Sequence, residues 1–186
     1  MKIIKTKLDG CIIIEPNIYA DERGFFLETF NEKRYQELAG IKEKFVQDNR
    51  SRSCKNVLRG LHFQKTKPQG KLVTVTEGSV FDVAIDLRPQ SKTFGMYETI
   101  ILTSENKIQF YIPPGFAHGF AVLSDIVDFQ YKCTDYYDPN DEGGIIWNDS
   151  DLSIKWPLSD PILSDKDAKQ PTLNSIRTKI YNGWKE

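Results

Sequence analysis

Short runs rich in Val, Ile, Phe, Tyr and Thr recur along the chain, and Gly, Pro, Asn or Asp separates each run from the next. Examples are residues 11–16 (CIIIEP), 24–30 (GFFLETF), 71–78 (KLVTVTEG) and 97–106 (YETIILTSEN). Many short strands with frequent turn signals are typical of an antiparallel sandwich or barrel. We therefore predict an all-β fold, a jelly-roll β-barrel with a few short flanking helices.

The alternative is a two-sheet sandwich without a ligand cavity. A small barrel can hold a ligand, because inward-facing positions alternate along each strand. Residues 76–87 (TEGSVFDVAIDL) predict a hairpin that turns at EGS, with Phe81, Val83, Ile85 and Leu87 on one face. Helical signals are sparse: Asn31 is expected to cap a helix that ends at Gly40, and Ser164 to cap one turn.

Length and composition set the class of protein. The chain has 186 residues, which is suited to one domain, with residues 170–186 as a peripheral polar tail on the surface or against a partner subunit. The net charge is -1, from 25 Lys+Arg and 26 Asp+Glu, which argues against a nucleic-acid partner. No apolar stretch is long enough for a membrane span. Three cysteines without a CxxC pair indicate reduced thiols and a cytoplasmic location.

Polar residues fall on strand faces that are otherwise apolar. Tyr131 shares a face with Val127 and Phe129, His118 is flanked at two-residue spacing by phenylalanines, and Lys71 lies in line with two valines. Taken singly, a strand tyrosine or histidine is usually structural, and a lysine at the mouth of an apolar face can extend to water. Their convergence in one predicted barrel would give a cavity lined by a base, a phenol and cations.

His62 and Arg59 would point to opposite faces of a regular strand. Gly60 lies between them, and a glycine inside a strand often marks a bulge. We predict a bulge at Gly60 that places both side chains on the same side. A metal site is a weaker possibility, because the chain has two histidines and Gln64 stands where an HxH pair would need the second one.

Six motifs together resemble those of the dTDP-4-dehydrorhamnose 3,5-epimerases, over roughly residues 3–168. In chain order they are RGLHFQ, QGKLV, GSVFDVAIDLR, SENKIQFYIPPGFAHGF, YKCTDYY and PILSDKDA. The resemblance implies a cupin-like jelly roll without metal or cofactor, and a homodimer that exchanges N-terminal strands. It implies a dTDP-linked 4-ketosugar substrate, inverted at C3 and C5 in dTDP-rhamnose or related deoxysugar biosynthesis.

The same resemblance assigns catalytic roles. His62 corresponds to the base, Asp167 to its carboxylate partner, Tyr131 to the proton donor on the other face of the sugar, and Lys71 to the cation near the keto oxygen. The chemistry suits these residue types, since both carbons flank a ketone and lose their protons through an enolate. The substrate-binding positions that it implies are Arg23, Glu28, Gln47, Asp48, Asn49, Arg59, His118, Tyr137, Glu142 and Lys166.

Within that set, Arg23 and Arg59 would hold the diphosphate and Tyr137 would stack on thymine, with Arg23 reaching the partner subunit's site. Pro114 and Cys133 depart from the family pattern without removing a reacting group. Some relatives invert C3 or C5 alone, so a mono-epimerase stays open. A metal-dependent cupin oxygenase or isomerase and a non-catalytic sugar-binding module are the alternatives from other classes.

Overall fold

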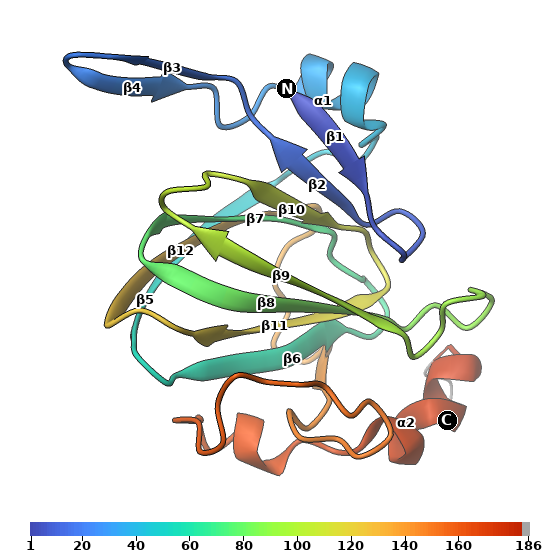
Figure 1. The fold of residues 1–186 in the computed structure, drawn as a ribbon. Helices are drawn as coiled ribbons and strands as arrows, with labels where there is room; N and C mark the ends of the chain where they lie inside the picture. Colours follow the sequence, from blue (N-terminus) through green and yellow to red (C-terminus); the bar gives the residue numbers. More distant parts are fainter. Residues whose placement is uncertain (184–186) are drawn as a thin grey trace.

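The protein is described here from a computed structural model, which defines residues 1–183; residues 184–186, the end of the predicted tail, lie outside the described part. Among residues 1–183 most regular elements are strands, with two α-helices and one 3-10 turn (Figure 1). The elements are β1 (Lys2–Lys5), β2 (Ile12–Glu15), β3 (Ile18–Asp21), β4 (Gly24–Leu27), α1 (Glu32–Ala39), β5 (Gln47–Cys54), β6 (Leu58–Gln64), β7 (Lys71–Glu77), β8 (Ser79–Asp86), β9 (Tyr97–Thr103), β10 (Gln109–Ile112), β11 (Phe116–Val122), β12 (Ile126–Cys133), β13 (Glu142–Gly144), η1 (Asp167–Lys169) and α2 (Leu173–Tyr181).

Within residues 1–183, all strands except the β3–β4 pair form two facing antiparallel sheets, and the predicted jelly-roll class is confirmed. One sheet has the order β1-β2-β10-β7-β12-β5, and the other has the order β13-β6-β11-β8-β9. Strand pairing within the described residues keeps these two sheets separate, so the jelly roll is a double sheet rather than a continuously hydrogen-bonded ring. This arrangement leaves room between the sheets for both a core and a cavity.

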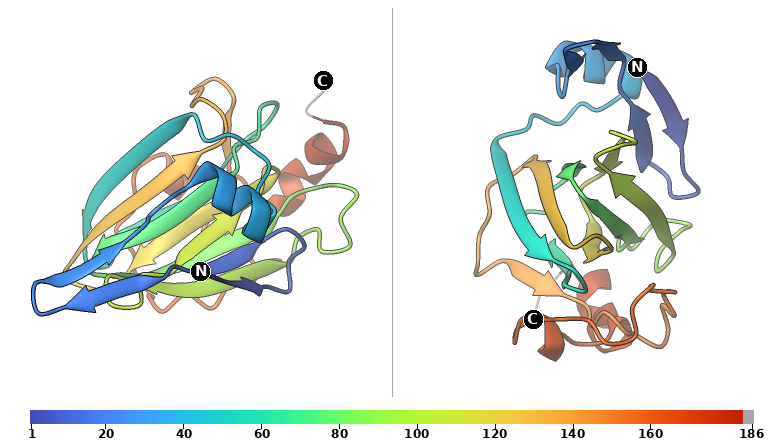
Figure 2. Two further views of the ribbon diagram at one scale, coloured as in Figure 1. Left: turned by 90° about the horizontal axis from the view of Figure 1, so that it is seen from above. Right: turned by 60° about the vertical axis from the view of Figure 1, so that its left-hand side comes forward.

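Three apolar clusters hold together four layers, which are the α1 region, the six-stranded sheet, the five-stranded sheet and the C-terminal segment. The first lies between the sheets and includes Val73, Phe110 and Phe129. The second joins the outer face of the five-stranded sheet to the C-terminal segment, and the third joins the outer face of the six-stranded sheet to the α1 region. Figures 1 and 2 show the N-terminal elements and the C-terminal segment at opposite ends of this stack.

The predicted hairpin over residues 76–87 is wrong. β7 pairs with β10 and β12, whereas β8 pairs with β11 and β9 in the other sheet. Gly78 instead makes a corner between the sheets, with φ +78°, and an added Cβ would lie 2.0 Å from the carbonyl oxygen of Ile126. Alternation along a strand gives the face of each residue, but it does not give the strand's partner.

The predicted helical turns have the expected local chemistry. The Asn31 side chain accepts a hydrogen bond from the backbone N–H of Arg34 at the start of α1, and Gly40 ends that helix in the left-handed conformation. Ser164 Oγ accepts from the backbone N–H of Asp167 at 3.1 Å. This last contact fixes the turn that presents the Asp167 carboxylate.

The C-terminal segment differs from the loose polar tail that the sequence predicts. Residues 173–181 form α2, which begins at the Thr172 cap, and Leu173, Ile176 and Ile180 are buried against the five-stranded sheet. These three apolar side chains recur at helical spacing within a polar stretch. Each contributes about 1.5–3 kcal/mol of burial free energy, which anchors the segment.

The β3–β4 hairpin projects from the body of the chain, and Figures 1 and 2 show it extending well beyond both sheets. Its large apolar side chains are exposed: Ile18 at 44%, Tyr19 at 64%, Phe25 at 61% and Phe26 at 69%. A cluster of exposed aromatic residues of this kind marks an interaction surface. Within residues 1–183, no helix has both the length and the apolar character needed to cross a membrane.

Candidate active site

A cavity of about 730 Å³ lies between the two sheets. Side chains from β5, β6, β7, β11 and β12 form its walls, and residues 162–167 form one rim. Eleven of the predicted site residues line it: Gln47, Asn49, Arg59, His62, Lys71, His118, Tyr131, Tyr137, Glu142, Lys166 and Asp167. The structure therefore brings most of the candidate residues into one place, including the strand residues Lys71, His118 and Tyr131 that alternation placed on inward faces.

The predicted irregularity at Gly60 is confirmed. Opposite β11, His62 pairs with His118 and Arg59 pairs with Phe120, so three steps on β6 match two on β11. Gly60 has φ +110°, and an added Cβ would lie 2.6 Å from the Cα of Gly119. The bulge puts both His62 and Arg59 on the cavity wall, where the Arg59 Nε donates to Ser53 Oγ at 3.0 Å.

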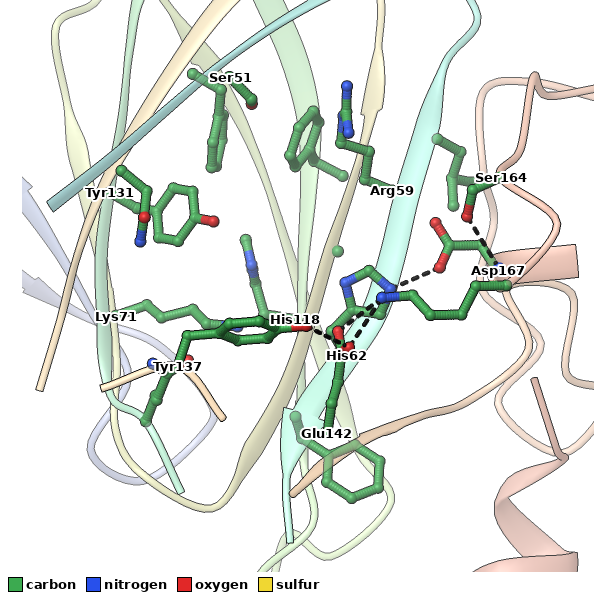
Figure 3. Close-up of a pocket in the computed structure, with 18 of the residues that line it drawn as sticks. Ser51, Arg59, His62, Lys71, His118, Tyr131, Tyr137, Glu142, Ser164 and Asp167 are labelled. Carbon is green, nitrogen blue, oxygen red and sulfur yellow. Dashed lines mark hydrogen bonds and ion pairs between the residues drawn. The ribbon is translucent and has the colours of Figure 1, made fainter. Parts of the chain in front are cut away.

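His62 and Asp167 form a hydrogen-bonded pair, with 2.6 Å between Nε2 and Oδ1. Although burial raises the pKa of Asp167, the hydrogen bond and charge of His62 outweigh it, and the net pKa is lowered. The carboxylate is thus ionised at neutral pH and accepts the proton of Nε2. In the tautomer that donates Nε2–H to Asp167, Nδ1 carries no proton, and Nδ1 faces the cavity (Figure 3).

Tyr131 lies across the cavity from His62, on the other sheet, and its hydroxyl points into the space between them (Figure 3). Burial raises the pKa of this phenol, so it stays protonated over the neutral range. The ring packs beside Phe129, with 6.0 Å between centroids. A base on one wall and a proton donor on the opposite wall can act on the two faces of one bound ring.

Lys71 and His118 lie deeper in the cavity. Burial lowers the pKa of the Lys71 ammonium, and burial also lowers the pKa of His118. The His118 Nε2 lies 2.9 Å from Oδ2 of Asp82, a carboxylate with no exposed surface. The cavity therefore contains a second imidazole–carboxylate pair, oriented from β8 and β11.

At one side of the cavity, Glu142 joins two other predicted residues. Its carboxylate accepts a hydrogen bond from the Tyr137 hydroxyl at 2.9 Å and pairs with the Lys166 ammonium at 2.9 Å. Burial raises the pKa of Glu142, but the hydrogen bonds from Lys166 and Tyr137 lower it more. Because Lys166 is adjacent to Asp167, the cluster of Tyr137, Glu142 and Lys166 lies beside the hydrogen-bonded pair of His62 and Asp167 (Figure 3).

Three predicted binding residues do not line the cavity of the single chain. Arg23 lies in the turn of the β3–β4 hairpin and pairs with Asp21, and Glu28 pairs with Arg34. Asp48 pairs with Lys132 instead, because β5 alternates and directs Gln47 and Asn49 inward. Their expected roles remain predictions, and those of the first two depend on a second subunit.

Sequence reasoning missed two polar residues, one that lines the cavity and one directly behind its wall. Asp82 was placed on the strand face opposite the apolar one, but both faces of β8 are buried, so Asp82 is enclosed beside His118. Gln64 was considered only as a missing metal ligand, although it is 5% exposed and lines the cavity. For Asp82, a carboxylate between Phe81 and Val83 in a strand is the signal that could have identified it, because a buried charge needs a partner.

The arrangement of the His, Cys, Asp and Glu side chains bears on whether the cavity could hold a metal ion. Within residues 1–183, no group of three or more His, Cys, Asp or Glu side chains is arranged to hold a metal ion. The Nε2 of each histidine is already bonded to a buried carboxylate. The donor set therefore favours acid–base chemistry at the two rings.

Fold and site together define a cupin-like jelly roll with an acid–base cavity. The family model described as dTDP-4-dehydrorhamnose 3,5-epimerase matches residues 5–175. A protein of that description from Methanothermobacter thermautotrophicus is 56% identical, over 89% of this chain and 91% of its own length, and one from Salmonella typhimurium is 53% identical, over 94% and 96%.

Solved structures agree with these sequence matches. The crystal structure of dTDP-6-deoxy-D-glucose-3,5-epimerase from Legionella pneumophila, in complex with dTDP-4-keto-L-rhamnose, superposes with a TM-score of 0.93 at 57% identity. The match covers 96% of each chain. The chain belongs to the dTDP-4-dehydrorhamnose 3,5-epimerase family, a family of isomerases.

Proposed function

We propose that this protein inverts C3 and C5 of a dTDP-4-keto-6-deoxyhexose, in dTDP-rhamnose or related deoxysugar biosynthesis. One observation carries the proposal: in a member of this family, an imidazole paired to a carboxylate faces a phenol across a single cavity. The Legionella relative was crystallised with dTDP-4-keto-L-rhamnose, which supports the substrate class.

In the proposed reaction, the Nδ1 of His62 removes the proton from a carbon next to the C4 ketone. The charge that develops on the keto oxygen is stabilised by the Lys71 ammonium. Tyr131 then delivers a proton to the opposite face of the same carbon, and the configuration inverts. Asp167 stabilises the imidazolium that forms on His62, since its ionised carboxylate lies 2.6 Å from Nε2.

Repetition of these steps at the second carbon requires His62 to lose its new proton to solvent and Tyr131 to regain one from solvent. It also requires the sugar to present C3 and C5 in turn to one base. The relatives at more than half identity are described as 3,5-epimerases, which favours inversion of both carbons over a mono-epimerase. Arg59 in the cavity is suited to a diphosphate oxygen, because a guanidinium presents a fork of donors. Tyr137 is suited to stack on thymine, since its ring is half-exposed beside the cavity.

The test is turnover of dTDP-4-keto-6-deoxyglucose in D2O, followed by NMR. We expect deuterium at both C3 and C5 and a product of inverted configuration at each. Deuterium at one carbon only would replace the proposal by a mono-epimerase. A sugar that binds but keeps both protons would indicate a binding module, and activity that is lost with chelator and restored by a transition metal would indicate a metal-dependent cupin.

We also propose a homodimer in which the β3–β4 hairpins are exchanged. The hairpin exposes four large apolar side chains, and Arg23 at its turn lies outside the cavity of its own chain. Exchange would bury the four apolar side chains and bring Arg23 to the proposed diphosphate site of the partner subunit. Sedimentation should give a dimer mass for the intact protein, and a Phe25→Asp/Phe26→Asp variant should shift to monomer; an intact protein that sediments as a monomer would contradict exchange.

The cytoplasm is the proposed location. Cys11, Cys54 and Cys133 are all free thiols, and Cys11 and Cys133 are buried. Thiols without a disulfide partner suit a reducing compartment.

A further inference from the structure

Tyr137 lies in a loop that has little apolar anchoring. The loop connects the end of β12 at Cys133 to the start of β13 at Glu142. Tyr136 is 66% exposed and Tyr137 is 50% exposed, so neither ring is held by a core. The Tyr137 hydroxyl donates to Glu142 at 2.9 Å, which holds the tip of the ring, and polar contacts must fix the backbone from which the ring extends.

Gln64 supplies those contacts from the end of β6. Its side-chain oxygen accepts a hydrogen bond from the backbone N–H of Asp138 at 2.8 Å. Its side-chain nitrogen donates to the carbonyl oxygen of Tyr136 at 3.2 Å and to that of Lys67 at 2.8 Å. One buried amide thus uses both of its hydrogens and its oxygen on backbone groups.

Two of these backbone groups belong to the peptide units on either side of Tyr137. The carbonyl of Tyr136 is part of the preceding unit, and the N–H of Asp138 is part of the following unit. The N–H of Tyr137 itself donates to the Gln47 side-chain oxygen at 2.9 Å. Because both flanking peptide planes are held, the backbone dihedral angles of Tyr137 are restricted, and so is the direction in which its ring leaves the chain.

We propose that Gln64 is a positioning residue that holds the ring of Tyr137 in the orientation needed to receive the nucleotide base. This inference rests on the proposed function, because it assigns the base-stacking role to Tyr137. Gln64 follows His62 by two residues on β6, so both side chains point to the same side of the strand. The strand therefore sets the distance between the reacting sugar and the base by carrying the catalytic imidazole and the anchor of the stacking loop.

The role requires an amide. Glutamate has nearly the same shape but no hydrogens to donate, so in Gln64→Glu the carboxylate would face the carbonyl oxygens of Tyr136 and Lys67. Leucine fills a similar volume and loses all three hydrogen bonds. Both variants should loosen the backbone on either side of Tyr137 while its bonds to Gln47 and Glu142 remain, and the glutamate variant does so without creating a cavity.

The expected result is a separation of kinetic constants. In Gln64→Glu and Gln64→Leu, KM for the dTDP-4-keto sugar and the calorimetric Kd for dTDP should each rise roughly tenfold to a hundredfold, since two to three hydrogen bonds and their preorganisation are lost. The kcat should fall by less than about threefold, because His62 and Tyr131 keep their places.

Asp149→Asn provides the matched control. Asp149 is also buried, at 3% exposure, and also fixes loop backbone by accepting from Asp151, Leu152 and Leu173, but it does not line the cavity. This variant should lose thermal stability and keep KM and the dTDP Kd within about twofold of the wild type. A rise in KM of similar size in the control would assign the Gln64 effect to general destabilisation.

A double-mutant cycle with Tyr137→Ala completes the test. If Gln64 acts through Tyr137, Gln64→Leu should change KM by less than about twofold once the ring is absent. Unchanged dTDP binding in both Gln64 variants, or full additivity with Tyr137→Ala, would overturn the inference. Failure of the wild-type protein to turn over the sugar would instead refute the proposed function, and the dTDP binding measurements would still decide the role of Gln64.

Discussion

Replacement of His62 by alanine should reduce turnover of the dTDP-4-keto sugar by roughly 10²–10⁴-fold, the range for removal of a general base. The Nε2 of this ring is held by Asp167 at 2.6 Å, and its Nδ1 faces the cavity in which the sugar is proposed to bind. Deuterium incorporation from D2O should fall by the same factor at both carbons, because proton abstraction starts each inversion. The measurement is NMR of the sugar with time.

Calorimetry with dTDP serves as the control for this variant. The nucleotide end is assigned to Arg59 and Tyr137, so the Kd for dTDP should stay within about twofold of the wild-type value. A His62→Ala protein that keeps wild-type turnover would remove the imidazole from the mechanism. A protein that loses dTDP binding in parallel would show that the ring mainly shapes the cavity.

Replacement of Tyr131 by phenylalanine should separate proton exchange from inversion. The base can still remove a proton and return a deuteron to the same face, whereas the opposite face has lost its donor. We therefore expect deuterium in recovered substrate of unchanged configuration, while formation of the inverted product falls roughly 10²–10⁴-fold. The retained ring should keep its packing against Phe129, so stability should change little.

Circular dichroism and a thermal melt check that packing in Tyr131→Phe. Equal loss of deuterium exchange and of inversion would mean that the Tyr131 phenol takes part in removing the proton. The assignment of His62 as base and Tyr131 as proton donor would then have to be reversed. Inversion at the wild-type rate would mean that water or another group donates the proton.

Much of the cavity was predictable from local pattern. Strand parity placed Lys71, His118 and Tyr131 on inward faces, and the glycine between Arg59 and His62 indicated the bulge that brings those two together. These features depend on residues within one strand, where the two-residue period has a direct structural meaning. The assignment of chemical roles came from the family motifs, since a lone histidine carries no role of its own.

Other features depended on contacts between distant segments. The corner at Gly78 determines which strands β8 pairs with, and alternation along β8 does not give this pairing. Asp82 is enclosed because layers on both sides bury β8, and α2 folds because the five-stranded sheet offers it an apolar face. In the proposed dimer, the hairpin around Arg23 would act at the partner's site, and the contacts of a single chain carry no signal of that role.

The close approach of Gly60 to Gly119 carries a consequence for how this enzyme can vary. The backbones of β6 and β11 touch there, and an added methyl group would lie 2.6 Å from the facing Cα. His62 lies two residues from one glycine and His118 adjoins the other, so wedging the strands apart would tilt both imidazoles at once. Two positions without a functional side chain thus constrain where both imidazoles can lie, and a side chain added at either glycine is expected to disturb both rings.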